Sequence, residues 1–119
     1  MANQYSNQAI PEISVEELAV RMEQSPDNLQ LIDVREPREI EIASIEGFQV
    51  LPLSEFTDWA EQVFDRFDAH AETLVLCHHG MRSAQMCQWL ISRGFTNVKN
   101  IVGGIDSYSL LVDQNVPRY

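Results

Sequence analysis

Three features follow one another in TLVLCHHGMRSAQMCQWLISRG (Thr73–Gly94): an apolar run, a tight loop and a helical pattern. The run Thr73–Cys77 is continuously β-branched or apolar, which is typical of a central parallel strand covered on both faces. A helical pattern over Arg82–Arg93 is followed by Gly94, the residue type that most often ends a helix. The stretch predicts a strand, a loop and a helix, with Cys77 at the end of the strand.

Helical and strand-like segments alternate through the rest of the chain. A helix is expected from the capping-box signature of Ser14 and Glu17 up to Pro26. Further strands are predicted at Leu29–Val34, Phe48–Leu53 and Val98–Val102, and further helices at Glu36–Ala43, Ser54–Phe67 and Ile105–Asp113. Such alternation indicates an α/β fold, a parallel sheet with helices on its faces.

Length and composition indicate one compact domain. The 119 residues are 45% hydrophobic and 22% charged, which is ordinary for a globular protein with a real core. Residues 1–10 are polar and without periodicity, so we expect a flexible tail there. Nothing in the sequence resembles an export signal or reaches the roughly 20 apolar residues of a membrane span, so the cytoplasm is the expected compartment.

The charge of the chain limits its partners. A formal net charge of −10, with Lys99 as the single lysine, argues against nucleic acid, which needs a dense basic surface. A membrane partner is not expected either. Screening confines surface charges to about 8 Å at physiological salt, so a local cluster of donors can still bind an anion. The two cysteines are expected to be reduced, because a chain of this size needs no disulfide.

The loop after Cys77 has the features of a chemical site. Ligands of open α/β sheets bind at the carboxyl ends of strands, where this cysteine is expected. Gly80 permits a backbone turn closed to other residues, and the helix beginning near Ser83 adds its positive end and free N–H groups. Arg82 is the nearest permanent cation in the sequence. Since such surroundings favour a thiolate, we interpret Cys77 as a nucleophile.

Two other interpretations of Cys77 remain open. It could be a small buried hydrophobe, as free cysteines often are. It could also bind a metal with His78 and His79, although adjacent residues in a tight loop rarely point at one ion and His70 is isolated. The two imidazoles either flank the mouth of a pocket or are merely exposed.

Other polar and reactive residues have weaker signals. Cys87 shares a helical face with apolar residues, which favours packing over a role as a resolving thiol. Asp33 and Arg35 form either a surface ion pair of little value or an orienting pair at the pocket rim, since their strand should neighbour that of Cys77. The acidic stretch Glu36–Glu46, which includes Glu39 and Glu41, is expected to be a solvated helix face.

A thiolate cradled by N–H groups suits a substrate that carries oxyanions beside an electrophilic atom. Two chemistries fit this description. One is sulfur transfer through a cysteine persulfide, and the other is phosphoryl transfer through a phosphocysteine.

Three motifs resemble one known family. The loop CHHGMRS (Cys77–Ser83) resembles the active-site loop of the rhodanese-like sulfurtransferases. LIDVREPREI (Leu31–Ile40) is similar to the first signature of that family, and GFTNVKNIVGGIDSY (Gly94–Tyr108) is similar to its C-terminal signature. The three motifs occur in the right order and with the right spacing.

The resemblance implies a single rhodanese-like domain over residues 11–119, with a doubly wound, mainly parallel sheet. Cys77 would take a sulfane sulfur from a donor such as thiosulfate and pass it to a thiophilic acceptor, either cyanide, a thiol or a protein. No metal or organic cofactor is implied. Asp33 and Arg35 would support the pocket rim, and the substrate-binding loop would consist of His78, His79, Gly80, Met81, Arg82 and Ser83.

The sequence departs from the family pattern at two places. Ser44 stands where the family often has a histidine and Phe48 where it has a small residue. Tyr108 stands where tryptophan is common. The first departure changes local packing and hydrogen bonding, and neither touches the nucleophile, so the resemblance defines the fold more closely than the substrate.

Two alternatives to a small-molecule sulfurtransferase follow from the same loop. A cysteine phosphatase or arsenate reductase has five residues between cysteine and arginine, whereas four separate Cys77 from Arg82, so the cradle should be too small for a tetrahedral phosphate. The other alternative is a sulfur-carrier module that acts by docking to a partner protein rather than by efficient turnover.

Overall fold

The computed structural model describes residues 9–24 and 26–119. Residues 1–8 of the predicted tail lie outside the described part. Ile10, which was also assigned to the tail, packs against the hydrophobic core, and the carbonyl of Pro11 accepts a hydrogen bond from the amide of Asn100. The packed domain therefore includes Ile10.

One sheet organises the molecule. Its strand order is β1-β5-β4-β2-β3, and every pair of neighbours is parallel. The strands are β1 (Glu12–Ile13), β2 (Leu29–Asp33), β3 (Gln49–Val50), β4 (Glu72–Leu76) and β5 (Val98–Ile101). The predicted parallel α/β fold is confirmed, and the β4 strand that precedes Cys77 lies at the centre of the sheet.

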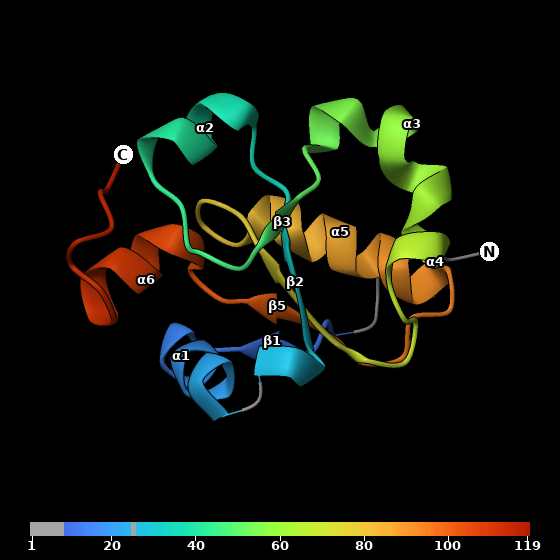
Figure 1. Ribbon diagram of the computed structural model, residues 1–119, viewed down its shortest axis with the longest axis horizontal. Helices are drawn as coiled ribbons and strands as arrows, with labels where there is room; N and C mark the ends of the chain where they lie inside the picture. The colour runs from blue at the N-terminus through green and yellow to red at the C-terminus, as the bar shows by residue number, and fades with distance from the viewer. Residues whose placement is uncertain (1–8, 25) are drawn as a thin grey trace.

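Helices cover both faces of this sheet (Figure 1). Three 3₁₀ turns, Pro26–Asn28, Leu53–Glu55 and Ala60–Gln62, connect some of the elements. The helices are α1 (Val15–Gln24), α2 (Pro37–Ile42), α3 (Phe56–Trp59), α4 (Val63–Arg66), α5 (Met81–Ser92) and α6 (Gly104–Leu111). No helix among the described residues combines the length and the apolar character that crossing a membrane requires.

Alternate side chains of β4 and the residue after it enter two separate cores. Val75 and Cys77 belong to the cluster beneath α3, α4 and α5, whereas Leu74 and Leu76 belong to the cluster beneath α1 and α6. All four are almost fully buried. Because a strand covered on both faces needs apolar residues at every position, the continuous run around Cys77 is explained.

The segment predicted as a strand over Phe48–Leu53 is mostly irregular, with only Gln49–Val50 in β3. The amides of Leu51 and Leu53 still donate to the carbonyls of Asp33 and Val34, at 2.8 and 3.4 Å. Pro52 between them has no N–H to donate, so regular pairing stops before it. The sequence prediction also missed β1, whose two residues are too few for a periodic signal.

The prediction of one continuous helix over Ser54–Phe67 is wrong. The segment consists of α3 and α4 with a 3₁₀ turn before each. Ser54 does not cap a helix, because its hydroxyl and amide both donate to the carboxylate of Glu36. The indole of Trp59 donates to the carbonyl of Pro52 at 2.8 Å, which fixes the start of the segment against the core.

The start of α6 packs directly against the chain that follows β4. The amides of Ile105 and Asp106 donate to the carbonyls of Cys77 and His78, at 2.9 and 3.2 Å. A Cβ atom on Gly104 would lie 2.4 Å from both of these carbonyl oxygens. Only glycine fits there, so the pair Gly103-Gly104 is what lets α6 approach the Cys77 loop.

Replacement of Gly104 by alanine should destabilise the fold far more than the same change at Gly94. Both residues have positive φ, but a Cβ on Gly94 would meet nothing within 4 Å. We expect Gly94→Ala to lower the free energy of unfolding by about 1 kcal/mol and Gly104→Ala to lower it by at least about 3 kcal/mol. Urea unfolding of both variants measures this, and equal losses would contradict the close contact.

Candidate active site

The thiol of Cys77 lies at the carboxyl end of β4, the first residue after the strand. Its sulfur accepts hydrogen bonds from the amide of Gly80 at 3.0 Å and from the hydroxyl of Ser83 at 3.2 Å. Gly80 has φ +107, as the sequence analysis expected of a residue that turns the strand into α5. The N-terminal end of α5 begins at Met81, and such an end favours negative charge beside it.

Cys87 provides a comparison within the same chain. Both cysteines are free and buried, and both belong to the same core cluster. Burial raises the pKa of Cys87 to about 12, which keeps this thiol protonated at neutral pH. Its predicted packing role is confirmed by its complete burial. The donors at the sulfur therefore distinguish Cys77 from an ordinary buried cysteine.

A buried asparagine that the sequence analysis missed holds the loop together. Asn100 lies on β5, and its amide nitrogen donates to the carbonyl of Gly80 at 3.0 Å. Its side-chain oxygen accepts a short hydrogen bond from the hydroxyl of Ser83. The only signal in the sequence was an uncharged polar residue within the strand VKNIV, on the face that packs against α5.

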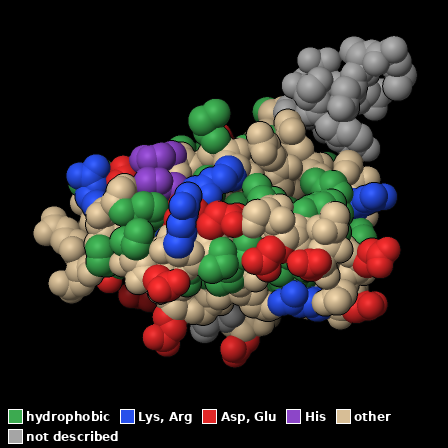
Figure 2. All heavy atoms as spheres, turned by 90° about the horizontal axis from the view of Figure 1, so that it is seen from above, with side chains coloured by type: hydrophobic (Ala, Val, Ile, Leu, Met, Phe, Trp, Pro, Cys, Tyr) green, Lys and Arg blue, Asp and Glu red, His purple; other side chains and the backbone are tan. Residues whose placement is uncertain are grey.

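The two histidines after Cys77 differ in their environments. His79 is exposed, whereas the ring of His78 is stacked on that of His79 with centroids 3.9 Å apart. Burial, followed by the neighbouring His79, lowers the pKa of His78, so this imidazole is neutral at pH 7. Its Nε2 is buried and has no hydrogen-bond partner among the described residues. Histidine side chains adjoin basic and acidic ones on the face seen in Figure 2.

Arg82 is held by a carboxylate that the sequence analysis placed on a solvated face. Its Nη1 and Nη2 donate to the two oxygens of Glu39 at 2.7 and 2.9 Å. This pairing is the main reason that the pKa of Glu39 falls to about 2. The prediction for Glu39 is wrong, because only 13% of its side chain is exposed; Glu41 on the same helix is exposed, as expected.

Asp33 and Arg35 form a fully buried ion pair. The guanidinium donates to both carboxylate oxygens, with the shortest bond 2.7 Å, and the two side chains are at most 1% exposed. The alternative of a surface ion pair is therefore wrong. As expected, β2, which ends at Asp33, lies next to β4. The orienting role of the pair stays a prediction.

One aromatic residue that had no signal in the sequence joins these groups. The hydroxyl of Tyr119 donates to Glu39 at 2.8 Å and accepts from Arg35 at 3.0 Å. Its ring is stacked on that of His78. Asp33, Arg35, Glu39, Arg82 and Tyr119 thus form one connected polar cluster beside the Cys77 loop.

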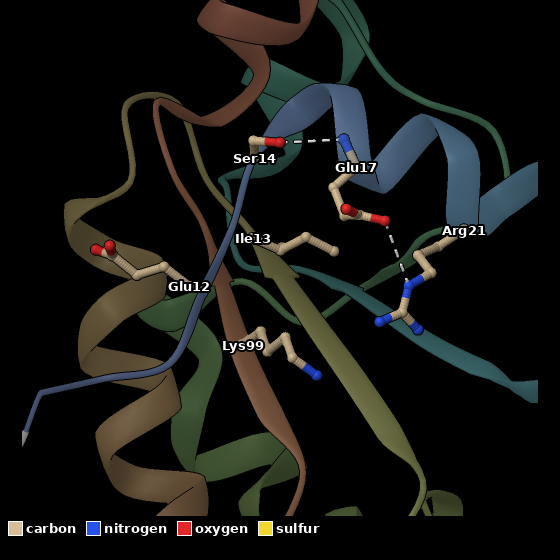
Figure 3. A pocket seen from close by; sticks show the side chains of 6 residues that line it. All are labelled: Glu12, Ile13, Ser14, Glu17, Arg21 and Lys99. Carbon is tan, nitrogen blue, oxygen red and sulfur yellow. Dashed lines mark hydrogen bonds and ion pairs between the residues drawn. The ribbon is translucent and has the colours of Figure 1, made fainter.

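Two surface hollows lie apart from the loop. The first, of about 330 Å³, lies along β1, the start of α1 and β5; Figure 3 shows its lining. Its two cations, Arg21 and Lys99, are both paired with Glu72. The second, of about 340 Å³, lies between α3, α4 and α5. Neither includes a residue of the segment from Cys77 to Ser83, and the candidate site is identified by the hydrogen bonds to the Cys77 sulfur.

The loop segment Cys77–Ser83 contains every residue predicted to bind substrate. Met81 is 80% exposed and Ser83 is fully buried, so the loop presents side chains both to solvent and to the core. Among the described residues, no three His, Cys, Asp or Glu side chains gather as a metal site requires. The chemistry available at the loop is that of a thiol, its two hydrogen-bond donors and a paired guanidinium.

The chain is similar to a rhodanese-like protein and to proteins named as a sulfur carrier and a sulfurtransferase. A relative from Arabidopsis thaliana, named Rhodanese-like/PpiC domain-containing protein 12, chloroplastic, is 50% identical over 113 residues, 92% of this chain and 38% of that protein. The putative sulfur carrier protein YrkF of Bacillus subtilis is 33% identical over 85% of this chain and 52% of its own length. The thiosulfate sulfurtransferase GlpE of Vibrio cholerae is 29% identical over 81% of this chain and 85% of its own length.

The fold agrees with these sequence matches. A crystal structure of a rhodanese-like domain protein from Staphylococcus aureus superimposes with a TM-score of 0.72 at 22% identity, covering 92% of this chain and 99% of that one. The chain spans about half or less of the Arabidopsis and Bacillus relatives. The sequence model of the rhodanese-like domain matches residues 14–111. Because this match covers most of the sheet and the Cys77 loop, the chain belongs to the rhodanese-like domain family.

Proposed function

We propose that this protein is a sulfurtransferase that carries sulfur on Cys77 as a persulfide. The supporting observation is the thiol at the end of β4 with two donors, the amide of Gly80 and the hydroxyl of Ser83, directed at its sulfur. The same donors that hold a thiolate can hold the terminal sulfur anion of a persulfide. Relatives named as a thiosulfate sulfurtransferase and a putative sulfur carrier support the assignment.

The proposed reaction has two displacement steps. The Cys77 thiolate attacks the sulfane sulfur of a donor such as thiosulfate; a bond between the two sulfurs forms, the S–S bond of the donor breaks, and sulfite leaves with the electron pair. A thiophilic acceptor, cyanide, a thiol or a protein, then attacks the outer sulfur, and the Cys77 thiolate leaves. No redox partner is needed, because the oxidised sulfur supplied by the donor passes on to the acceptor.

Arg82 is proposed to orient the anionic donor near Cys77. Its bonds to Glu39 use two of the five N–H donors of a guanidinium. The remaining donors can face an oxyanion while Glu39 fixes the plane of the group. The pairing with Glu39 also raises the pKa of Arg82, so its charge is permanent.

A second candidate shares the persulfide and differs in the acceptor. The Bacillus relative is named a putative sulfur carrier, and the exposed Met81 beside the site offers an apolar contact for a docking protein. In this case Cys77 would readily form the persulfide, but small acceptors would remove the sulfur slowly.

The predicted cytoplasmic location also stays a proposal. The name of the Arabidopsis relative assigns that protein to the chloroplast.

Treatment with thiosulfate should add the mass of one sulfur atom to the wild-type protein. Cys87→Ala serves as the matched control, because it removes the other buried thiol, and should gain the same mass. Cys77→Ala should gain none. Intact-protein mass spectrometry gives the result, and an unmodified wild type or a modified Cys77→Ala protein would refute the assignment.

Steady-state turnover of thiosulfate with cyanide separates the two candidates. A sulfurtransferase should turn over many times and lose at least about a thousandfold in rate in Cys77→Ala, because the nucleophile is gone. A carrier should charge Cys77 to completion but transfer slowly to cyanide. Turnover that is equal in wild type and Cys77→Ala would exclude Cys77 from the reaction.

The four-residue loop should not accept a tetrahedral phosphate. We expect vanadate, a phosphate analogue, to leave the charging of Cys77 by thiosulfate unchanged, and we expect no hydrolysis of an aryl phosphate by the wild type. Mass spectrometry measures the addition of sulfur to Cys77 in the presence and absence of vanadate. Competitive inhibition, or hydrolysis abolished in Cys77→Ala, would favour the phosphatase alternative.

Glu39→Gln should destabilise the protein through the loss of the bond pair to Arg82. We expect the free energy of unfolding to fall by about 1–2 kcal/mol at pH 7, a value reduced because Arg82 is partly exposed to water. Glu41→Gln, an exposed change on the same helix, should alter it by less than about 0.5 kcal/mol.

This difference should depend on pH. The pKa of Glu39 is lowered from 4.5 to about 2, so its stabilising charge is fully present above pH 4.5 and is lost as pH falls towards 2. The gap in stability between wild type and Glu39→Gln should therefore narrow over that interval, as measured by urea unfolding at a series of pH values. A gap that is constant from pH 7 to pH 2 would show that the ion pair does not stabilise the fold.

A further inference from the structure

The segment after α6 is fixed to the domain and brings Tyr119 to the Cys77 loop. Val116 is buried in the core beneath α1 and α6, and its carbonyl accepts a hydrogen bond from the hydroxyl of Ser109. Arg118 pairs with Asp106 at 2.9 Å on the first turn of α6. These contacts place Tyr119 beside the loop.

The ring of Tyr119 lies flat on His78. Their ring centroids are 3.9 Å apart and their planes differ by 9°. The ring of His79 is also stacked on that of His78, with centroids 3.9 Å apart. His78 directly follows Cys77, and its carbonyl is also bound by the amide of Asp106. Tyr119 therefore restrains the side chain of His78, while α6 restrains the backbone of the same residue.

The hydroxyl of Tyr119 lies between two groups of opposite charge. It donates to Oε1 of Glu39 at 2.8 Å and accepts from Nη1 of Arg35 at 3.0 Å. Burial is the largest of the causes that raise the pKa of Tyr119, so the phenol keeps the proton that it donates. The hydroxyl thus joins the buried Asp33–Arg35 pair to the carboxylate that holds Arg82.

The two contacts of Tyr119 act on opposite ends of the loop. The ring acts on His78, the residue after the nucleophile, and the hydroxyl acts through Glu39 on Arg82, five residues beyond the nucleophile. Without the hydroxyl, Glu39 would lose one partner of its Oε1 atom, and Arg35 would lose one acceptor in a nearly water-free place. The carboxylate would keep its bonds from Arg82 and from the amide of Glu36, but its Oε1 atom, and with it the plane of the Arg82 guanidinium, would be less tightly fixed.

We propose that Tyr119 is a positioning residue of the sulfur-transfer site, whose hydroxyl orients Arg82 towards anionic donors through Glu39 and whose ring holds His78. This inference rests on the proposed function. It assigns Tyr119 no contact with the reacting sulfur atoms. Its role is to align the guanidinium for an anion, and a neutral reagent should therefore be insensitive to the loss of the hydroxyl.

The test compares two tyrosine variants with a matched control. Tyr119→Phe removes the hydroxyl and keeps the stacked ring, and Tyr119→Ala removes both. Tyr108→Phe is the control, because Tyr108 is also partly buried, packs against the same core as Tyr119 and has a hydroxyl without a hydrogen bond among the described residues. Each variant is measured for turnover of thiosulfate with cyanide and for alkylation of Cys77 by anionic iodoacetate and neutral iodoacetamide.

For Tyr119→Phe we expect the KM for thiosulfate to rise about fivefold, the effect of one lost hydrogen bond, with kcat changed less than about twofold. The rate with iodoacetate should fall by a similar factor, and the rate with iodoacetamide should stay within about twofold of wild type. Tyr119→Ala should also alter the rate with iodoacetamide, because His78 loses one of its two stacking partners. Tyr108→Phe should behave as wild type in every assay.

Three results would overturn the inference. Unchanged KM and iodoacetate rate in Tyr119→Phe would show that the hydroxyl does not orient Arg82. Equal loss with iodoacetate and iodoacetamide would show a general disturbance of the loop. A similar loss in Tyr108→Phe would show a general effect of removing a tyrosine hydroxyl. If instead wild-type Cys77 fails to form a persulfide, the proposed function fails, while the ratio of the two alkylation rates still tests the role of Tyr119.

Discussion

The close contact between α6 and the chain after β4 is the constraint on which the site depends. Two amides at the start of α6 bind the carbonyls of Cys77 and His78, and this approach is open only because Gly104 has no side chain. The contact holds the backbone at Cys77 from one side, and Asn100 on β5 holds Gly80 from the other. A loop whose backbone carbonyls are bound at both positions can present a sulfur to its donors without depending on the conformations of long side chains.

The charged groups around the loop are joined to one another in a connected series of ion pairs and hydrogen bonds. Asp33 balances Arg35, Tyr119 joins Arg35 to Glu39, and Glu39 balances Arg82. A buried ion pair contributes little net stability by itself, but the loss of one partner leaves an uncompensated charge. The cluster thus fixes the geometry of the site more than it stabilises the domain. It also keeps a cation beside the thiol of a chain whose net charge is −10.

The sequence predicted the features that depend on local pattern. The buried run before Cys77, the turn at Gly80 and the glycine end of α5 follow from neighbouring residues, and the structure has all three. The helix over residues 54–67 was mispredicted because apolar periodicity does not distinguish one continuous helix from short helices separated by 3₁₀ turns. Glu39, Asn100 and Tyr119 were missed for another reason. Each acts through partners 17 to 84 residues away, and no local pattern reports such contacts.

The hydroxyl of Ser83 has one hydrogen but two acceptors, the sulfur of Cys77 and the side-chain oxygen of Asn100. It can satisfy only one of them fully at a time. An anionic sulfur is the stronger acceptor, so the hydrogen turns to Cys77 when the sulfur is charged and back to Asn100 when it is neutral. The orientation of one buried O–H bond therefore follows the charge of the Cys77 sulfur. This change of partner needs the rotation of a single bond and no movement of the backbone.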